Sequence, residues 1–204
     1  MRSSDRQLHA RPTGLRIVGG IHRGRRLLAP PGEAVRPTSE RAREALFNIL
    51  SHGEFAAAGL PFADCPVLDA FAGTGAFGLE ALSRGAGMAA FIESDAQALT
   101  ALRRNIAALA ETGRARIIAG DACRPPPAAF ACKLVFLDPP YGAGLAALAA
   151  AGWLAPDAIA VIEIAAREEF LAPPGFTSID ERVYGAARLV FLRRQRPLEE
   201  TPDG

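Results

Sequence analysis

One glycine-rich segment constrains the fold more than any other part of this 204-residue chain. An apolar run ends at Asp69, and Gly73, Gly75 and Gly78 follow with the spacing G-x-G-x-x-G. In a strand–turn–helix unit, glycines at this spacing permit a tight turn and let a ligand approach the backbone. The segment therefore predicts an α/β sheet with a ligand site at the carboxyl ends of its strands.

The remaining pattern alternates between short apolar runs and amphipathic segments. We expect strands at residues 67–69, 89–93, 115–119, 134–138 and 158–164, and helices at 76–84, 96–111 and 144–151. Residues 176–183 and 187–193 flank a Tyr-Gly-Ala turn, which predicts an antiparallel hairpin. This order predicts a Rossmann-like, mostly parallel twisted sheet with an antiparallel last strand.

Acidic residues follow four successive predicted strands: Asp69, Glu93, Asp121 and Asp138. The glycine pattern alone fits a nicotinamide dinucleotide as well as S-adenosylmethionine. Asp69, however, stands where a dinucleotide would place its pyrophosphate, and a carboxylate repels phosphate. S-adenosylmethionine carries an ammonium and a sulfonium and no phosphate. The acidic residues therefore favour S-adenosylmethionine as the cofactor.

A second chemical motif, Asp138-Pro139-Pro140-Tyr141, ends the apolar run that starts at Leu134. Neither proline can donate an N–H, and both restrict the backbone. The turn can present a carboxylate, rigid carbonyl groups and an aromatic ring to a planar base with an exocyclic amino group. In isolation, a Pro-Pro turn with a buried tyrosine explains the motif equally well. The glycine loop upstream favours the catalytic interpretation.

Basic residues are concentrated at the start of the chain. Residues 1–52 contain ten arginines against four acidic residues, whereas the remainder contains thirteen basic and eighteen acidic residues. A general preference for arginine over lysine does not explain why the excess is confined to one end. A basic arm on an acidic body indicates nucleic-acid binding. The residues expected to contact RNA are Arg16, Arg23, Arg25, Arg26, Arg36 and Arg41.

The chain divides into four predicted regions. Residues 1–14 lack apolar periodicity and are expected to be a disordered extension; residues 197–204 are expected to be a disordered tail. Residues 15–52 are expected to form a basic hairpin, with strands at 15–20 and 26–29, and a helix capped by Thr38 or Ser39. Residues 53–196 are expected to form the cofactor-binding domain.

The three cysteines are scattered without a C-x-x-C pair, so we expect neither a metal site nor a disulfide. The apolar stretch from Leu145 to Ala166 contains Pro156 and Asp157, and we interpret it as a helix, a turn and a strand rather than a membrane span. We see no signal peptide and expect a cytoplasmic, monomeric protein.

Together these residues resemble the RsmD-type 16S ribosomal RNA guanine-N2 methyltransferases, a family with the class I S-adenosylmethionine-dependent fold. The resemblance runs from about Leu15 to Arg193. The glycine loop, Glu93 and D-P-P-Y indicate only an amino-group methyltransferase. The family is specified by the segments Arg16-Ile-Val-Gly-Gly20, Gly24-Arg25, Arg36-Pro-Thr38, Arg41 and Glu44-Ala-Leu-Phe-Asn-Ile-Leu50.

The resemblance implies a role for each part of the site. Gly73 and Gly75 would approach the methionine part of the cofactor, and Glu93 would hold the ribose hydroxyls. Asp69 and Phe71 would complete the cofactor site, with Asp121 and Ala122 beside the adenine. Residues 138–141 would hold the target guanine, of the guanine-966 type, in 16S ribosomal RNA within a partly or fully assembled small subunit.

Four alternatives stay open at this point. A DNA adenine-N6 or cytosine-N4 methyltransferase uses the same D-P-P-Y chemistry, but this chain has no room for a sizeable target-recognition insertion. Another RNA guanine-N2 methyltransferase would share every motif. A nicotinamide oxidoreductase and a non-catalytic RNA-binding module fit less well. The chain departs from the family pattern in the segment before Leu15 and in the short segment 142–152.

Overall fold

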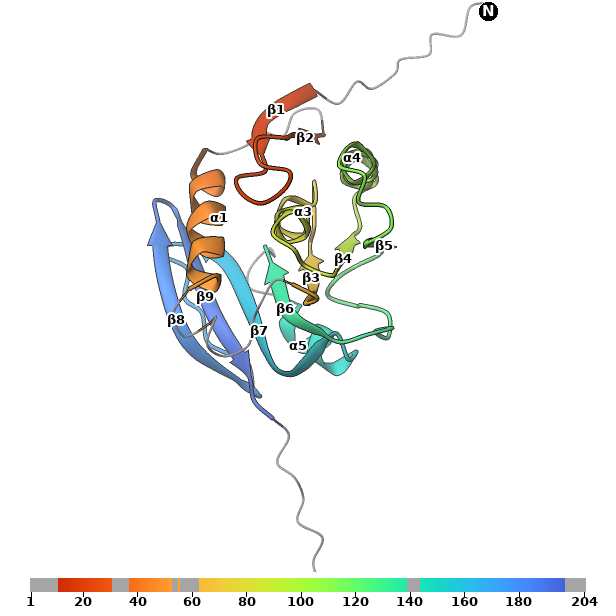
Figure 1. Cartoon of the computed structure of the whole chain (residues 1–204). Helices are drawn as coiled ribbons and strands as arrows, with labels where there is room; N and C mark the ends of the chain where they lie inside the picture. The colour runs from red at the N-terminus through yellow and green to blue at the C-terminus, as the bar shows by residue number, and fades with distance from the viewer. Residues whose placement is uncertain (1–10, 31–36, 53–54, 56–62, 139–143, 197–204) are drawn as a thin grey trace, which may run out of the picture.

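The computed structural model describes residues 11–30, 37–52, 55, 63–138 and 144–196. Its centre is a seven-stranded sheet in the order β5-β4-β3-β6-β7-β9-β8 (Figure 1). The strands are β3 (Pro66–Ala70), β4 (Met88–Glu93), β5 (Ala115–Ala119), β6 (Cys132–Leu137), β7 (Leu154–Ala165), β8 (Phe176–Tyr184) and β9 (Ala187–Arg194).

The first five strands run parallel to one another, whereas β9 is antiparallel to both of its neighbours, β7 and β8. The sheet confirms the predicted Rossmann-like class and its antiparallel last strand. Because β9 inserts between β7 and β8, the last strand of the chain lies inside the sheet rather than at its edge.

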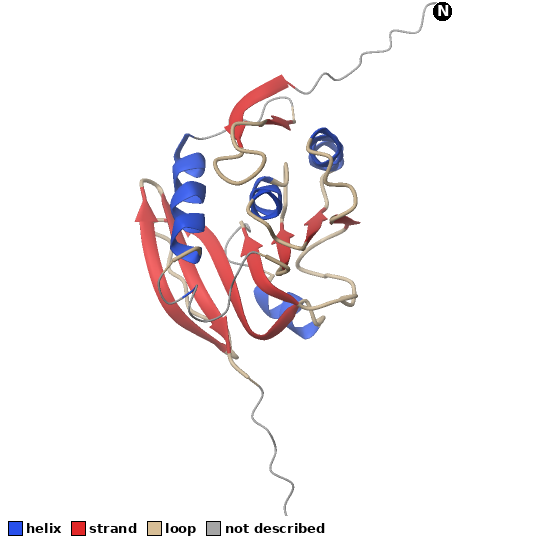
Figure 2. Ribbon diagram, viewed as in Figure 1, coloured by secondary structure: helices blue, strands red, loops and turns tan. Residues whose placement is uncertain are grey.

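Apolar residues alternate between the two faces of the sheet, since successive side chains of a strand point in opposite directions. One face packs against α1 (Pro37–Leu50), α3 (Ala76–Ser83) and α4 (Ala96–Ala108). On this face, Phe136 of β6 contacts Phe47 of α1 and Phe77 of α3, with ring centroids 5.5 and 5.3 Å apart. The other face packs against α5 (Leu145–Ala150) and Trp153 (Figure 2).

The start of α4 agrees with its sequence pattern, but its end does not. Asp95 caps the helix by accepting a hydrogen bond of 2.7 Å from Ala98 N. We expected the helix to continue to residue 111 and to stop at Gly113. It ends at Ala108 instead, because Ala110 adopts a left-handed conformation with φ 59°. In the chain reversal that follows, Glu111 N donates a hydrogen bond to Ile106 O.

The N-terminal hairpin begins earlier than expected. Strand β1 (Arg11–Arg16) pairs antiparallel with β2 (Arg26–Ala29), so Arg16 lies opposite Arg26. The prediction of a disordered extension is therefore wrong for residues 11–14, while residues 1–10 and 197–204 lie outside the described part. The expected strand 15–20 is largely the turn of the hairpin, because its two glycines at 19 and 20 leave the ladder and pack on α3.

Two further element boundaries differ from the sequence expectation. Helix α1 starts at Pro37, ahead of the two expected caps, in keeping with the preference of proline for the first helical position. Strand β7 starts at Leu154 and contains the expected Pro156–Asp157 turn. Asp157 has φ 59° and the ladder with β6 shifts register nearby, so the turn signal marks a bulge within the strand.

No helix in the described ranges is both long enough and apolar enough to cross a membrane.

Candidate functional site

The glycine loop is held against the end of β4 by Glu93. Gly73 N donates a hydrogen bond of 2.7 Å to Glu93 Oε2, while Ser94 N and Asp95 N donate to Oε1 at 2.8 and 2.7 Å. One carboxylate thus accepts three backbone N–H groups from two segments. This arrangement brings the predicted Gly73 and Glu93 together at the carboxyl edge of the sheet.

The three glycines of the loop are required for different structural reasons. At Gly73, which has φ 52°, a Cβ would have no heavy atom within 4 Å, so the space above it is open to a ligand. At Gly75, which has φ 81°, a Cβ would lie 2.4 Å from Leu102 Cδ1, and at Gly78 it would lie 2.3 Å from Phe91 Cε1. Gly73 therefore meets the requirement for close ligand approach, while Gly75 and Gly78 let the loop and α3 pack on the core.

Asp69 lies beneath the loop with only 2% of its surface exposed. Its Oδ2 accepts a hydrogen bond of 2.9 Å from Gly78 N. Burial raises the pKa of Asp69 to about 8; the Gly78 hydrogen bond opposes this shift, and the charges of Asp138 and Glu93 add to it. Asp69 is therefore within electrostatic reach of the other two predicted acids, Glu93 and Asp138. Asp69 supports the loop from below instead of facing the open space.

The residues expected beside the adenine meet the segment that follows the D-P-P-Y motif. Asp121 is exposed, and its Oδ1 accepts a hydrogen bond of 2.8 Å from Cys123 N. Gly144, the N-cap residue of α5, packs so closely that a Cβ there would lie 3.1 Å from the Phe71 ring and 3.4 Å from Ala122 O. Segments following β3, β5 and β6 thus converge at one point.

Asp138 follows directly after β6, and its side chain is exposed. The register places Leu137 beside Ala70, the last residue of β3, and beside Ile162 of β7, so Asp138 lies just beyond the end of β3 and next to the last residues of β7. The other three residues predicted to hold the target base, Pro139, Pro140 and Tyr141, lie outside the described residues.

The hairpin turn is attached to α3 by buried polar contacts that the sequence did not reveal. Val18 N donates to Glu80 Oε2 at 2.8 Å, and Ser83 Oγ donates to Gly19 O at 2.5 Å. A Cβ at Gly20 would lie 1.9 Å from Ser83 O, which explains the paired glycines of the turn. Glu80 is fully buried and anchors the hairpin.

Asn105 of α4 joins the hairpin to the glycine loop. Its side-chain carbonyl accepts from Leu28 N at 2.8 Å, and its amide donates to Leu28 O and to Thr74 O, each at 3.0 Å. The side chain is 1% exposed. One amide thereby fixes strand β2 relative to the backbone of the cofactor loop.

The arginines of the basic arm have several different environments. Arg16 Nε lies 2.5 Å from Glu40 Oε1, and this hydrogen bond, with attraction to Glu40 and Glu44, raises the pKa of Arg16. Arg25 donates to Ala108 O at 2.7 Å, at the carboxyl end of α4 where a cation is favourable. Arg23, Arg26 and Arg41 are exposed, and their side chains make no hydrogen bond or ion pair with the described residues; Arg36 lies outside these residues.

Arg43 was counted as part of the basic arm, but the structure buries it. Its guanidinium is 1% exposed, donates to Arg16 O at 2.5 Å and lies 3.8 Å from Glu80 Oε2. Burial lowers the pKa of Arg43, and nearby carboxylates, including Asp69, oppose the shift. A sequence signal was present, because Arg43 occupies the same helical stripe as the buried residues 46, 47 and 50.

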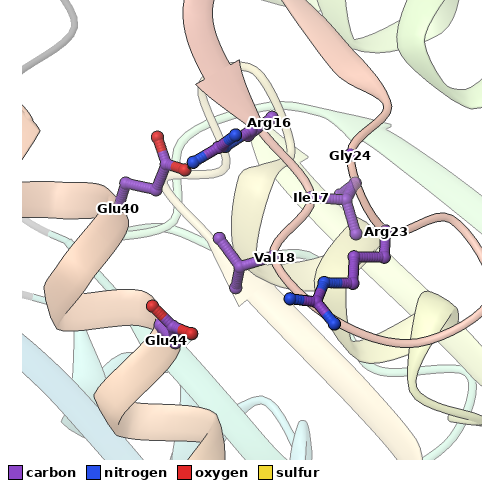
Figure 3. Close-up of a pocket in the computed structure, with 7 residues that line it drawn as sticks. All are labelled: Arg16, Ile17, Val18, Arg23, Gly24, Glu40 and Glu44. Atoms are coloured by element: carbon purple, nitrogen blue, oxygen red, sulfur yellow. The ribbon is translucent and has the colours of Figure 1, made fainter.

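A pocket lies between the hairpin and α1 (Figure 3). Its hairpin side is formed by residues 16–18 with Arg23 and Gly24, and its α1 side by Glu40 and Glu44. We refer to these residues together as the hairpin pocket. It contains charges of both signs and is separate from the glycine loop and Asp138.

The sheet order, the glycine loop after β3 and the acidic strand ends define a methyltransferase of the Rossmann-like class. Known proteins agree. The chain is 35% identical over 207 residues to Ribosomal RNA small subunit methyltransferase D of Escherichia coli (strain K12), covering 96% of this chain and 98% of that protein. A family model described as Conserved hypothetical protein 95 matches residues 15–193, and the chain belongs to this family.

Further relatives give the same assignment. The Haemophilus influenzae protein named Ribosomal RNA small subunit methyltransferase D is 33% identical over 183 residues, covering 84% of this chain and 89% of that protein. The solved structure of yhhF from Escherichia coli superimposes with a TM-score of 0.73 at 34% identity, covering 89% of this chain and 98% of that one. The match confirms the predicted resemblance and its span.

Proposed function

We propose that this protein transfers a methyl group from S-adenosylmethionine to the exocyclic N2 of a guanine in 16S ribosomal RNA. The observation that carries the proposal is the convergence of the glycine loop, Glu93 and Asp138 at one edge of the sheet. The names of the Escherichia coli and Haemophilus influenzae relatives support the small-subunit RNA as substrate.

The residues present fit S-adenosylmethionine. The space above Gly73 is open, and carboxylates stand at the ends of β4 and β5. When bound, the cofactor would supply the methyl group on an activated sulfonium. Glu93 would accept a hydrogen bond from the ribose hydroxyls through Oε2. A carboxylate has about four acceptor positions, three of which are used by backbone N–H groups, and only one of those three is on Oε2. Asp121 and Ala122 would lie beside the adenine.

Asp138 is proposed to orient the target amine. The lone pair of guanine N2 is conjugated with the ring, so the nitrogen is a poor nucleophile. Asp138 and the carbonyl of Pro139 would accept its two hydrogens and direct the lone pair toward the methyl group, while Tyr141 would stack on the base. The new C–N bond would form as the methyl–sulfur bond breaks, and one N2 proton would then pass to solvent, so Asp138 need not be a strong base. Because the sulfonium already activates the methyl group, most of the rate acceleration would come from positioning.

RNA contact is proposed for the exposed face of the hairpin. Arg23 and Arg26 are exposed, whereas the guanidinium of Arg25 is committed to the end of α4. Replacing Arg23 and Arg26 with glutamine should raise the KM for RNA and flatten its salt dependence, because each phosphate contact contributes a fixed amount to the slope. Affinity for S-adenosylmethionine should not change. An unaltered salt slope would place the phosphate contacts elsewhere.

The decisive experiment is transfer of labelled methyl groups to three substrates: small ribosomal subunits lacking native methylation, naked 16S RNA, and duplex DNA. Nucleoside analysis should find N2-methylguanosine in RNA. Asp138→Ala should lower kcat by about 100-fold or more, the scale for loss of one preorganised polar partner. Asp138→Asn should retain part of the activity, and Glu169→Ala, at an exposed acid far along the chain, is the matched control. Methylated adenine or cytosine in DNA would refute the proposal.

A further inference from the structure

The hairpin pocket has no role in the proposed cofactor and target sites, yet its two walls are held rigidly. Arg43 of α1 donates to Arg16 O at 2.5 Å and so joins the helix wall to the hairpin wall. Val18, also in the hairpin wall, is joined to α3 because its backbone N donates a hydrogen bond of 2.8 Å to Glu80 Oε2. Because both walls are anchored by buried side chains, the pocket is preformed, and a ligand would not have to order it.

The charges in the pocket are only partly compensated. Arg16 and Glu40 form an ion pair at 2.5 Å. Arg23 and Glu44 are both exposed, and within the described residues neither side chain makes a hydrogen bond or an ion pair, although Glu44 attracts Arg16 at longer range. Figure 3 shows the apolar side chain of Val18 between them. The pocket therefore offers a guanidinium and a carboxylate, separated by a small apolar surface.

The guanidinium, the carboxylate and the apolar surface between them together match one nucleotide of an unpaired RNA strand. A guanidinium binds phosphate, and a carboxylate accepts hydrogen bonds from base amino and imino groups. In single-stranded RNA these base edges are accessible to side chains. Glu40 and Glu44 would repel a free phosphate, so a simple anion site fits poorly. Uracil presents two carbonyls beside its single N–H, and it would therefore be the base least suited to Glu44.

The position of the pocket also fits a substrate strand. Arg43 immediately precedes Glu44, and its guanidinium is within electrostatic reach of Asp69 and Glu163. These acids lie on β3 and β7, the two neighbours of β6, which Asp138 follows. Arg43 therefore joins the hairpin wall by its hydrogen bond to Arg16 O and also interacts with acids on both strands beside β6. A strand that presents its target base to Asp138 can place a nearby nucleotide in the pocket.

We propose that the hairpin pocket is a base-reading subsite for one unpaired nucleotide near the target guanine. Glu44 accepts hydrogen bonds from the base edge, Val18 contacts its apolar face, and Arg23 binds the adjoining phosphate. This inference rests on the proposed function, because it takes the substrate to be RNA.

The test is a binding selection on small-subunit RNA in which the nucleotides flanking the target guanine are randomised. Bound and free pools are sequenced for the wild-type protein and for Glu44→Gln, Arg23→Gln and the control Glu169→Gln. The wild-type protein should deplete uridine at one flanking position by about ten-fold, within the range for a well-placed base contact. Glu44→Gln should abolish this depletion, because an amide can also donate to a uracil carbonyl, while the control should preserve it.

Arg23→Gln should weaken binding of all sequences alike without changing the base preference. The subsite would be refuted by a wild-type protein with no preference at any flanking position, or by a preference that survives Glu44→Gln. Methyl transfer to the same pool is measured in parallel. If transfer is absent while the selection shows the expected pattern, the proposed function fails and the subsite stands.

Discussion

The buried carboxyl of Asp69 predicts that the stability of this protein falls as the pH rises toward 8. The pKa of Asp69 is about 8 in the folded chain, against an ordinary value of about 3.9. Folding therefore favours the protonated carboxyl. This contribution to stability is fully present below about pH 4 and is lost as the pH rises through about 8.

The structure sets the size of the effect. Between those two pKa values the folded chain holds one more proton at this site than the unfolded chain, which corresponds to about 1.4 kcal/mol per pH unit. Between pH 5 and pH 7 the loss should be about 3 kcal/mol. The protonated state is possible because Asp69 is 2% exposed and uses Oδ2 to accept from Gly78 N, a bond that a neutral carboxyl can keep.

Asp69→Asn isolates the effect, since an amide is close in shape to the protonated acid and does not titrate. Urea unfolding of both proteins at pH 5, 6 and 7 gives the difference in free energy of unfolding, in which all other titrating groups cancel. The variant should gain about 3 kcal/mol relative to the wild-type protein between pH 5 and pH 7. A difference that does not change with pH would show that Asp69 is already ionised in the folded chain.

Three further predictions concern the loop and its supports. Asn105→Leu should lower the free energy of unfolding by about 2–4 kcal/mol, because three buried hydrogen bonds are lost, and hydrogen exchange at Leu28 N should become faster. Glu93→Ala should weaken S-adenosylmethionine binding by about 1.5–3 kcal/mol in calorimetry, and tight binding of NAD to the wild-type protein would contradict the cofactor assignment. Gly73→Ala should reduce cofactor affinity and cost about 1–2 kcal/mol of stability through its left-handed φ alone. Gly75→Ala should lose more stability than Gly73→Ala, by about 1–3 kcal/mol, because its Cβ would also collide with the core, as urea unfolding would show. Equal effects of the two glycine variants on stability would refute the distinction between them.

The sequence alone determined the architecture and the chemistry expected at the sheet edge. Apolar runs with period two and amphipathic stripes with period 3.6 are local patterns, so strand 115–119 and the succession of strands along the chain from β3 to β9 were predicted correctly. The glycine loop and the acids at the ends of β3 and β4 were also predicted from the sequence, because a parallel sheet places the carboxyl ends of its strands along one edge.

Local pattern failed where a neighbour distant in sequence decides the conformation. Gly19 and Gly20 were assigned to a strand because the preceding residues are apolar, but Ser83, more than 60 positions away, draws them into a turn. The left-handed Ala110 ended α4 before Gly113, the residue with the stronger intrinsic preference for that conformation.

Only the tertiary structure decided which polar residues support the site. Glu80 and Asn105 look like ordinary helix residues in the sequence, and Arg43 is marked only by its place in an apolar stripe, yet each is almost fully buried. Their partners in the hairpin are 27 to 77 positions away, and burial of a polar side chain is tolerable only when such partners satisfy its hydrogen bonds. A sequence specifies which groups can form these bonds, but the packing of helices on the sheet determines which of them meet.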